Sequence, residues 1–294
     1  MREAVRTIVC CPACRGTLGE RACRECDAPF TRTASGAYRF VREAASDVDA
    51  LFQVETQNGT SLRGRLFGAG KAVLSSEYQP VDRLRTFLND ADGVVVELGA
   101  GSRRLRPDVI TVDLFESAQT DLVADIAACP IATDSADHVI LDSVIEHVPD
   151  PAAVVAEAHR ILKPGGRLFI NCPFMLPYHG YPRHYQNFTR DGLEHLLRSF
   201  DHVTVAPTFG PMTACVNMIS ETIAVLAGGE RGFRYMAAKG AVLLPIFWLK
   251  YLDRYLTRAA RSHRVAGMLC AVAQAAEGAA AVAPAPRRPA ALAA

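Results

Sequence analysis

Four cysteines near the start of the chain have the spacing of a metal site. Cys11 and Cys14 form one C-x-x-C pair, and after eight residues Cys23 and Cys26 form a second. Two such pairs can present four thiolates in a tetrahedron, which is the usual arrangement around a structural Zn²⁺. The spacing therefore predicts a closed zinc site that holds the fold and does no chemistry. A reduced knuckle without metal is the alternative, and the neighbouring Cys10 can replace Cys11 as a ligand.

A second chemical signal lies in "VVVELGAGS", where an apolar run ends in a turn with Gly99 and Gly101. Glycine can take a positive φ and lets the backbone approach a ligand closely, so this turn predicts the floor of a ligand crevice at the end of a strand. A dinucleotide fingerprint needs a third small residue where this chain has Arg104. The sequence therefore disfavours NAD and FAD, and a strand-to-helix turn that binds no nucleotide is the remaining alternative.

Three carboxylates follow successive predicted strands near this turn. Glu97 closes the first strand, Asp113 closes the second, and Asp125 follows a third, very short one. S-adenosylmethionine has a nucleoside, no pyrophosphate and two cationic groups, so it suits carboxylates at this edge. Asp113 can accept both hydrogen bonds of a ribose diol, and Asp125 can receive the adenine amino group. Each acid alone is more often an ordinary turn residue or helix cap.

Candidate groups for acceptor chemistry follow the fourth and fifth strands. His147, in "IEHVP", can act as a general base at the crevice or can be a packing or capping histidine. His184 and Tyr185 lie in the aromatic loop "PYHGYPRHYQNF" and are predicted to contact the acceptor. The same aromatic residues can instead pack a lid.

The fold prediction rests on short apolar runs that alternate with helical segments. Runs at 94–98, 108–114, 137–143, 166–172, 201–207 and 266–274, with the short third strand, predict a doubly wound, Rossmann-like α/β fold around a mostly parallel seven-stranded sheet. The chain divides into a cysteine-rich head at 1–41, a helical linker and cofactor cap at 42–92, and a main domain at 93–275. A helical insertion is predicted at 208–264 and a disordered tail at 276–294.

Composition excludes some classes of function. With 32 basic and 31 acidic residues the net charge is +1, which disfavours nucleic acid as a partner. No run of about 18 uninterrupted apolar residues is present, and the first residues lack the apolar core of a secretory signal. We therefore expect a cytoplasmic protein with reduced cysteines. Residues 230–264 carry eight Lys or Arg against two acids, so peripheral membrane contact is one hypothesis and a solvated helix face is the other.

Together these motifs resemble a known family. "VVELGAGS", "ADIAACPIATDSADHVILDSVIEHVPDP" and "AHRILKPGGRLFINCP" are similar to the class I S-adenosylmethionine-dependent methyltransferases, in particular the type 11 group. The resemblance covers about residues 90–205 and places Glu97, Gly99 and Gly101 around the methionine part of the cofactor, Asp113 on the ribose and Asp125 near the adenine. Arg103 departs from the family, which often has a small residue there. The head is similar to short zinc-ribbon proteins that activate methyltransferases, which implies packing against the catalytic domain.

The resulting hypothesis is a methyltransferase that acts on an oxygen or nitrogen of a small molecule or of a glycan- or lipid-linked precursor. Two alternatives stay open at this point. One is an RNA methyltransferase, because an N-terminal cysteine cluster also precedes this domain in ribosomal RNA enzymes. The other is a non-catalytic interaction protein that keeps the methyltransferase fold as a scaffold. The sequence leaves the oligomeric state open.

Overall fold

The computed structural model describes residues 3–41, 75–180, 183–228 and 232–277. Most of the predicted helical linker and nearly all of the predicted disordered tail lie outside these residues. Along the chain the helices and strands are α1 (Glu3–Ile8), β1 (Thr31–Arg32), β2 (Tyr38–Arg39), α4 (Arg83–Asn89), β3 (Val95–Leu98), β4 (Ile110–Asp113), β5 (Leu122–Val123), η1 (Ile126–Ala128), β6 (Ala136–Asp142), η2 (Ile145–His147), α5 (Pro151–Ile161), β7 (Leu162–Pro173), α6 (Arg190–Leu196), β8 (Phe200–Phe209), α7 (Pro211–Gly228), α8 (Phe233–Ile246), η3 (Phe247–Leu252), α9 (Asp253–Leu256), η4 (Ser262–Val265) and β9 (Met268–Ala275).

The sheet confirms the predicted doubly wound α/β class. Its strands follow the order β1-β2-β5-β4-β3-β6-β7-β9-β8, and the six central strands from β2 to β7 pair in parallel. The strands β9 and β8 extend the sheet in antiparallel pairing. All seven predicted strands are present. The sheet has nine strands rather than seven because β2 of the head pairs with β5, and β1 pairs with β2.

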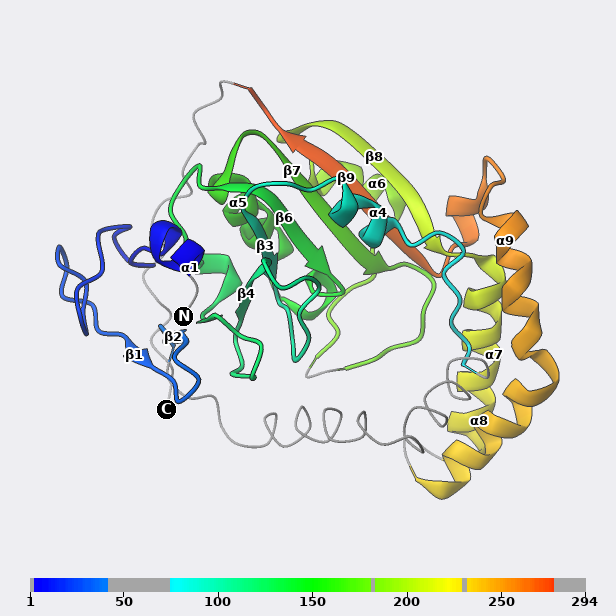
Figure 1. Cartoon of the computed structure of the whole chain (residues 1–294). Helices are drawn as coiled ribbons and strands as arrows, with labels where there is room; N and C mark the ends of the chain where they lie inside the picture. Colours follow the sequence, from blue (N-terminus) through cyan, green and yellow to red (C-terminus); the bar gives the residue numbers. More distant parts are fainter. Residues whose placement is uncertain (1–2, 42–74, 181–182, 229–231, 278–294) are drawn as a thin grey trace.

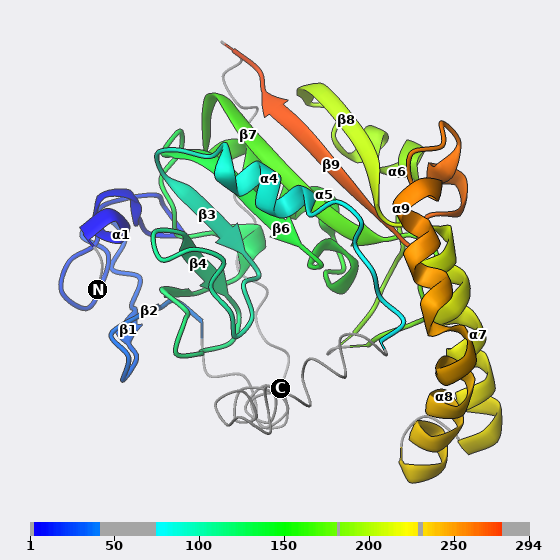
Figure 2. The same cartoon turned by 45° about the vertical axis from the view of Figure 1, so that its right-hand side comes forward.

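Both faces of the sheet are covered, because side chains along each strand alternate between them. Val95 and its neighbours on one face pack with Phe87 of α4, whereas Val96 and its neighbours on the other face pack with Val154 of α5. Figure 2 shows α4 across the near face of the sheet and α5 on the far side. Apolar runs predict these strands well since a central parallel strand must be buried on both faces.

One expected element is missing from the described chain. The glycine turn after β3 was predicted to lead into a helix, but residues 99–109 form a loop that runs directly to β4. Arg104, which stands where a dinucleotide fingerprint needs a small residue, lies in this loop. Its guanidinium donates to the Val109 carbonyl (2.6 Å) and to the Asp121 carboxylate (2.9 Å). The loop is therefore fixed by an arginine rather than by helix packing.

The chain between β8 and β9 is helical and forms a hairpin. The helices α7 and α8 lie side by side and extend from the end of β8 beyond the sheet, on the right of Figure 1. The short elements η3, α9 and η4 then return the chain to β9. By length and composition alone, α7 is apolar enough to cross a membrane.

Candidate active site

The glycine turn lies at the carboxyl end of β3, as predicted. Gly99 has φ +78° and Gly101 has φ +60°, a region that side chains with a Cβ rarely adopt. The turn also passes close to Val144, since a Cβ on Gly99 would lie 2.6 Å from a Val144 methyl carbon. Gly99 donates its N–H to the Val112 carbonyl (2.7 Å), which ties the turn to β4. The backbone path therefore requires a glycine at Gly99, and it favours one at Gly101.

Asp113 and Asp125 lie at the same edge of the sheet: Asp113 is the last residue of β4, and Asp125 follows β5. Asp113 is buried, and its two carboxylate oxygens accept the N–H groups of Gly101 (2.7 Å) and Phe115 (2.9 Å). Burial raises the pKa of Asp113, and these two hydrogen bonds act in the opposite direction. Asp125 is exposed and accepts the Ala127 N–H (2.9 Å) as the cap of η1. Each aspartate keeps lone pairs that can accept hydrogen bonds from a ligand.

Glu97 is the most perturbed carboxylate of the site. It is 1% exposed, and its Oε2 atom has no hydrogen-bond partner within the described residues. Burial raises its pKa to about 8, although the Arg103 guanidinium, 3.8 Å from Oε1, opposes the shift. A buried carboxylate without a partner is costly, so this position favours a cation or a donor that the described chain does not supply.

Three residues that the sequence analysis did not place in the site join it here. Arg103 forms an ion pair and a hydrogen bond with Asp142, the last residue of β6. Asn171 of β7 donates to the other oxygen of Asp142 (2.8 Å). The sequence could have indicated Asp142, because it is an acid at the carboxyl end of a central strand, like Glu97 and Asp113. The role of Arg103 depends on tertiary contacts and had no such signal.

These features fit S-adenosylmethionine. The orphaned Glu97 oxygen can receive a cationic group, and the turn at Gly99 and Gly101 lets the backbone approach it. Asp113 and Asp125 offer hydrogen-bond acceptors at the ends of two adjacent strands, on the edge where ligands of this fold class bind. The chemistry of these groups therefore agrees with S-adenosylmethionine, the cofactor that the sequence predicts.

A cleft of about 560 Å³ opens at this edge between α4 and the strand ends. Its lining includes Arg103, Asp142, Ser143, Asn171, Phe209 and Met268. A larger hollow of about 740 Å³ lies beside Arg106, Thr120 and Asp121, at the amino ends of β4 and β5. None of the three predicted cofactor acids lines either cavity. The cleft beside Arg103 is assigned to the site because it lies at the carboxyl ends of the strands, where ligands of open α/β sheets bind.

The predicted base His147 lies in a cluster of histidines around a buried acid. Glu146 is fully buried, and neither of its carboxylate oxygens has a hydrogen-bond partner in the described part of the chain. The Nε2 atoms of His147 and His179 lie 3.9 and 3.8 Å from Glu146 Oε1. The nearby Glu146 carboxylate raises the pKa of His179. By geometry, these three residues are one of two groups in the described chain that can hold a metal ion.

Hydrogen bonds orient the two imidazoles of this cluster. His147 Nδ1 lies 2.6 Å from the Arg183 carbonyl, and His179 Nδ1 lies 3.1 Å from the Pro177 carbonyl. A carbonyl can only accept, so both Nδ1 atoms carry the proton. When either ring is neutral, its Nε2 atom therefore keeps a free lone pair on the side that faces Glu146.

His184 and Tyr185 lie beside this cluster, but they are held differently. The His184 ring is 4.3 Å from the His179 ring, its Nδ1 atom accepts the His179 N–H, and its Nε2 atom bonds Asn187 (2.6 Å). Burial lowers the pKa of His184. Tyr185 has a half-exposed side chain and donates its backbone N–H to the Glu146 carbonyl. Acceptor contacts by these two side chains stay a prediction.

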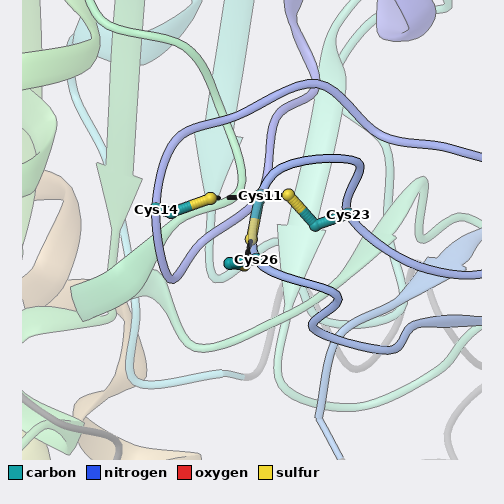
Figure 3. Close-up of side chains that lie close together, drawn as sticks. All are labelled: Cys11, Cys14, Cys23 and Cys26. Atoms are coloured by element: carbon teal, nitrogen blue, oxygen red, sulfur yellow. Dashed lines mark hydrogen bonds between the residues drawn. The ribbon is translucent and has the colours of Figure 1, made fainter.

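The four predicted cysteines form a second cluster, in the head. Figure 3 shows their side chains converging from two loops. The sulfur atoms of Cys11 and Cys26 are 3.6 Å apart, those of Cys14 and Cys23 are 3.4 Å apart, and all four lie within 4.8 Å of one another. A tetrahedron of thiolates about 2.3 Å from Zn²⁺ has edges of roughly 3.8 Å, so the spacing fits this ion. Cys11 belongs to the cluster, whereas Cys10 does not.

The two halves of this cluster repeat one backbone turn. Arg15 follows the first C-x-x-C pair and Asp27 follows the second, with φ of +63° and +57°. Arg15 donates its N–H to the Cys11 carbonyl (2.9 Å), and Asp27 donates to the Cys23 carbonyl (3.1 Å). Such paired turns aim both thiols of each pair inward.

The head packs directly on the main domain. The Arg15 side chain reaches the Cys129 carbonyl (2.6 Å) and the Glu157 carboxylate of α5 (2.9 Å). Glu157 also receives two hydrogen bonds from the buried Arg160 (each 2.9 Å). The cysteine cluster and α5 are thus joined by one charged network, because Arg15 directly follows Cys14.

Comparison with known proteins identifies the central segment. Residues 96–170, from β3 into β7, match the family model described as Methyltransferase domain, of the type 11 group. The Ubiquinone biosynthesis O-methyltransferase of Xanthomonas oryzae is 40% identical over 75 residues, which are 23% of this chain and 30% of that protein. The chain spans less than a third of the length of the curated relatives it matches. Residues 96–170 are therefore similar to a methyltransferase domain.

Solved structures are similar to the chain at lower sequence identity. A phosphoethanolamine N-methyltransferase 2 from Haemonchus contortus, in complex with phosphomonomethylethanolamine and S-adenosylhomocysteine, is 15% identical with a TM-score of 0.44. That match covers 80% of this chain and 61% of the other. The 1,6-didemethyltoxoflavin-N1-methyltransferase of Burkholderia thailandensis is 16% identical with a TM-score of 0.39, and the match covers 88% of this chain and all of the other.

Proposed function

We propose that this protein is an S-adenosylmethionine-dependent methyltransferase acting on an oxygen or nitrogen atom of a small molecule or of a glycan- or lipid-linked precursor. One observation carries the proposal. The buried Glu97 oxygen has no partner in the described chain, and it lies at the strand end that carries the glycine turn. A cationic ligand at this point would satisfy that oxygen. Asp113 and Asp125 lie on the same edge of the sheet, where they would accept hydrogen bonds from the nucleoside of that ligand.

Each residue of the edge has a distinct part in holding the cofactor. Glu97 would hold a cationic group of the methionine part, Asp113 the ribose hydroxyls and Asp125 the adenine amino group. S-adenosylmethionine supplies an electrophilic methyl group on its sulfonium. The chain's own contribution is to align the acceptor atom with that group, because an in-line displacement depends chiefly on distance and orientation.

His147 is the proposed base for an acceptor that must lose a proton. Its Nδ1 proton is committed to the Arg183 carbonyl, so the Nε2 lone pair can take a proton from a hydroxyl or an amine. Glu146, 3.9 Å from that nitrogen, would stabilise the resulting imidazolium. In this arrangement Glu146 is a positioning residue, and His184 and Tyr185 shape the acceptor pocket.

Isothermal titration of the full chain with S-adenosylmethionine tests the proposal. Asp113→Asn should weaken binding by about tenfold or more, because a charge-assisted pair to the ribose is lost. Asp108→Asn, just before β4 at the other end of the strand, is the matched control and should bind like the wild type. His147→Gln should also keep its affinity for the cofactor, since we place it on the acceptor side. A wild-type protein that is folded and shows no heat of binding would refute the proposal.

We also infer that the head holds one structural Zn²⁺ through Cys11, Cys14, Cys23 and Cys26. The four sulfur atoms already have tetrahedral spacing, and four thiolates leave no open position for a substrate. The role of the ion would be to fix the two turns that aim Arg15 at Glu157. Metal analysis of the purified chain should give one zinc per molecule.

A further inference from the structure

The hairpin of α7 and α8 is an apolar element that the described residues leave largely uncovered. Figures 1 and 2 both show the two helices packed along each other and extending away from the sheet. None of the 14 residues of α8 is buried, although most of them are apolar. A soluble helix normally buries its apolar stripe against a core, so this helix presents a surface that requires a partner.

Large apolar side chains are exposed along the whole hairpin. Near the tip, Leu226 is 82% exposed and Phe233 is 86% exposed. Other exposed members on the two helices and on the return to the sheet are Met218, Ile219, Ile223, Val225, Met236, Leu244, Trp248, Tyr251, Leu252, Tyr255 and Leu256. We call the surface formed by these thirteen residues the hairpin surface. Trp and Tyr near one end are typical of side chains that lie at the boundary between lipid and water.

The acids of the hairpin are engaged in internal contacts. Within 211–228 and 232–265 the only acids are Glu221 and Asp253. Glu221 binds Lys239 (2.7 Å) and the Tyr235 hydroxyl (2.8 Å). Asp253 is buried and accepts the N–H groups at the start of α7. Neither carboxylate is therefore presented as a free negative charge beside the hairpin surface.

The remaining charge is positive and exposed. Arg234 lies at the start of α8, and the return to β9 carries Arg254, Arg258, Arg261 and Arg264, all of them exposed. Basic residues beside exposed Leu, Phe and Trp side chains are complementary to anionic lipid headgroups over an acyl layer. Nucleic acid would use the arginines but leave the aliphatic side chains in water.

We propose that the α7–α8 hairpin binds the surface of a membrane that contains anionic lipids. The hairpin surface enters the headgroup region, and the arginines contact lipid phosphates. Binding at the surface, rather than crossing, follows from the Glu221–Lys239–Tyr235 cluster between the two helices, because a spanning hairpin would place this polar cluster in hydrocarbon. The apolar length of α7 alone does not overcome that cost.

The hairpin begins at the edge of the sheet that carries the candidate active site. Both β7 and β8 are antiparallel to β9, so α7 leaves β8 on the side where the central parallel strands end. Asp253 fixes the start of α7 to the return segment, and Lys250 donates to the Ser75 carbonyl (2.7 Å). The membrane would thus lie beside the acceptor side of the cleft. A lipid-borne acceptor follows from this placement and rests on the proposed function, whereas membrane binding does not.

Vesicle flotation of the full chain tests the proposal. We expect binding to vesicles of phosphatidylcholine with about a third phosphatidylglycerol and little binding to phosphatidylcholine alone. Arg254→Glu with Arg258→Glu should lower the partition coefficient by at least about tenfold, since each basic side chain near an anionic surface contributes about a factor of five. Leu226→Ser with Phe233→Ser should cause a loss of at least about tenfold, because two apolar side chains no longer enter the membrane. Arg6→Glu with Arg21→Glu, two exposed positions of the head, is the matched control for charge.

Several outcomes would overturn the proposal. One is equal binding to neutral and anionic vesicles. Another is that Arg254→Glu with Arg258→Glu and Leu226→Ser with Phe233→Ser both float as strongly as the wild type. Light scattering that shows a dimer, lost in Leu226→Ser with Phe233→Ser and accompanied by no flotation, would assign the hairpin surface to a second copy of the chain. Retention on RNA without flotation would assign it to nucleic acid. Flotation by a protein that fails to bind S-adenosylmethionine would support this proposal and refute only the proposed function.

Discussion

Glu97 gives a quantitative test of the site, because burial raises its pKa to about 8. At pH 7 about nine in ten molecules then carry a proton on this carboxyl group. A cationic ligand beside it favours the ionised form, so binding of S-adenosylmethionine must release that proton. Ionising Glu97 at pH 7 costs about 1.4 kcal/mol, and this cost grows by the same amount with each unit of lower pH.

We therefore expect the affinity for S-adenosylmethionine to rise about tenfold between pH 6 and pH 7. Isothermal titration in buffers of different ionisation enthalpy should give a release of close to one proton per site at pH 7. Glu97→Gln should abolish both the release and the pH dependence. Asp108→Asn, outside the site, should keep both. Binding to the wild type without proton release, or the same release from Glu97→Gln, would refute the assignment of Glu97 to a cationic group.

The stability of the unliganded protein should depend on pH in the opposite direction to the affinity for S-adenosylmethionine: it should fall as the pH rises. Below about pH 4.5 Glu97 is protonated in both the folded and the unfolded chain, so its burial does not depend on pH there. As the pH rises toward about 8 the unfolded chain ionises first, and the free energy of unfolding falls. Chemical denaturation over this range should give similar free energies of unfolding for the wild type and Glu97→Gln at low pH. The two free energies should differ increasingly as the pH rises.

Three further predictions concern stability. Cys26→Ser should abolish zinc binding and lower the melting temperature, whereas Cys215→Ser, an exposed cysteine outside the cluster, should change neither; a zinc content that stays at one per molecule in Cys26→Ser would contradict the site. Arg15→Ala should cost about 1–3 kcal/mol in urea denaturation because Glu157 and a buried carbonyl each lose a charged donor, and an unchanged midpoint would show that the head docks by other contacts. Gly99→Ala should weaken S-adenosylmethionine binding and destabilise the fold by about 1–3 kcal/mol, because its Cβ meets Val144 at a positive φ; a variant of wild-type stability and affinity would contradict the backbone geometry.

The parts of this fold that the sequence predicts are those with a local cause. Val95 to Leu98 read as a strand because a central parallel strand is apolar on both faces. Gly99 and Gly101 could be placed in the turn because the required φ is rare for other residues. The four clustered cysteines could be named because two C-x-x-C pairs are a local pattern. In each case a few consecutive residues contain the whole physical reason.

Features that depend on long-range contacts were missed or left open. Strands β1 and β2 are two residues long and have no apolar pattern, so only their pairing with β5 reveals them. The contact of Arg103 with Asp142 joins positions 39 residues apart. His179 meets Glu146 because the loop after β7 folds back over η2. No periodicity or spacing near either residue indicates such a meeting.

The pairing of β2 with β5 makes the head a protective border of the sheet. Tyr38 and Arg39 cover the outer side of Leu122 and Val123, where a bare strand would offer unpaired N–H and C=O groups to any other chain. A protein shortened by its first 41 residues would expose the unpaired N–H and C=O groups of β5 at the edge of the sheet. Such a fragment should self-associate through its sheet, so attempts to isolate the rest of the chain without its cysteine-rich start should yield aggregates rather than a monomer.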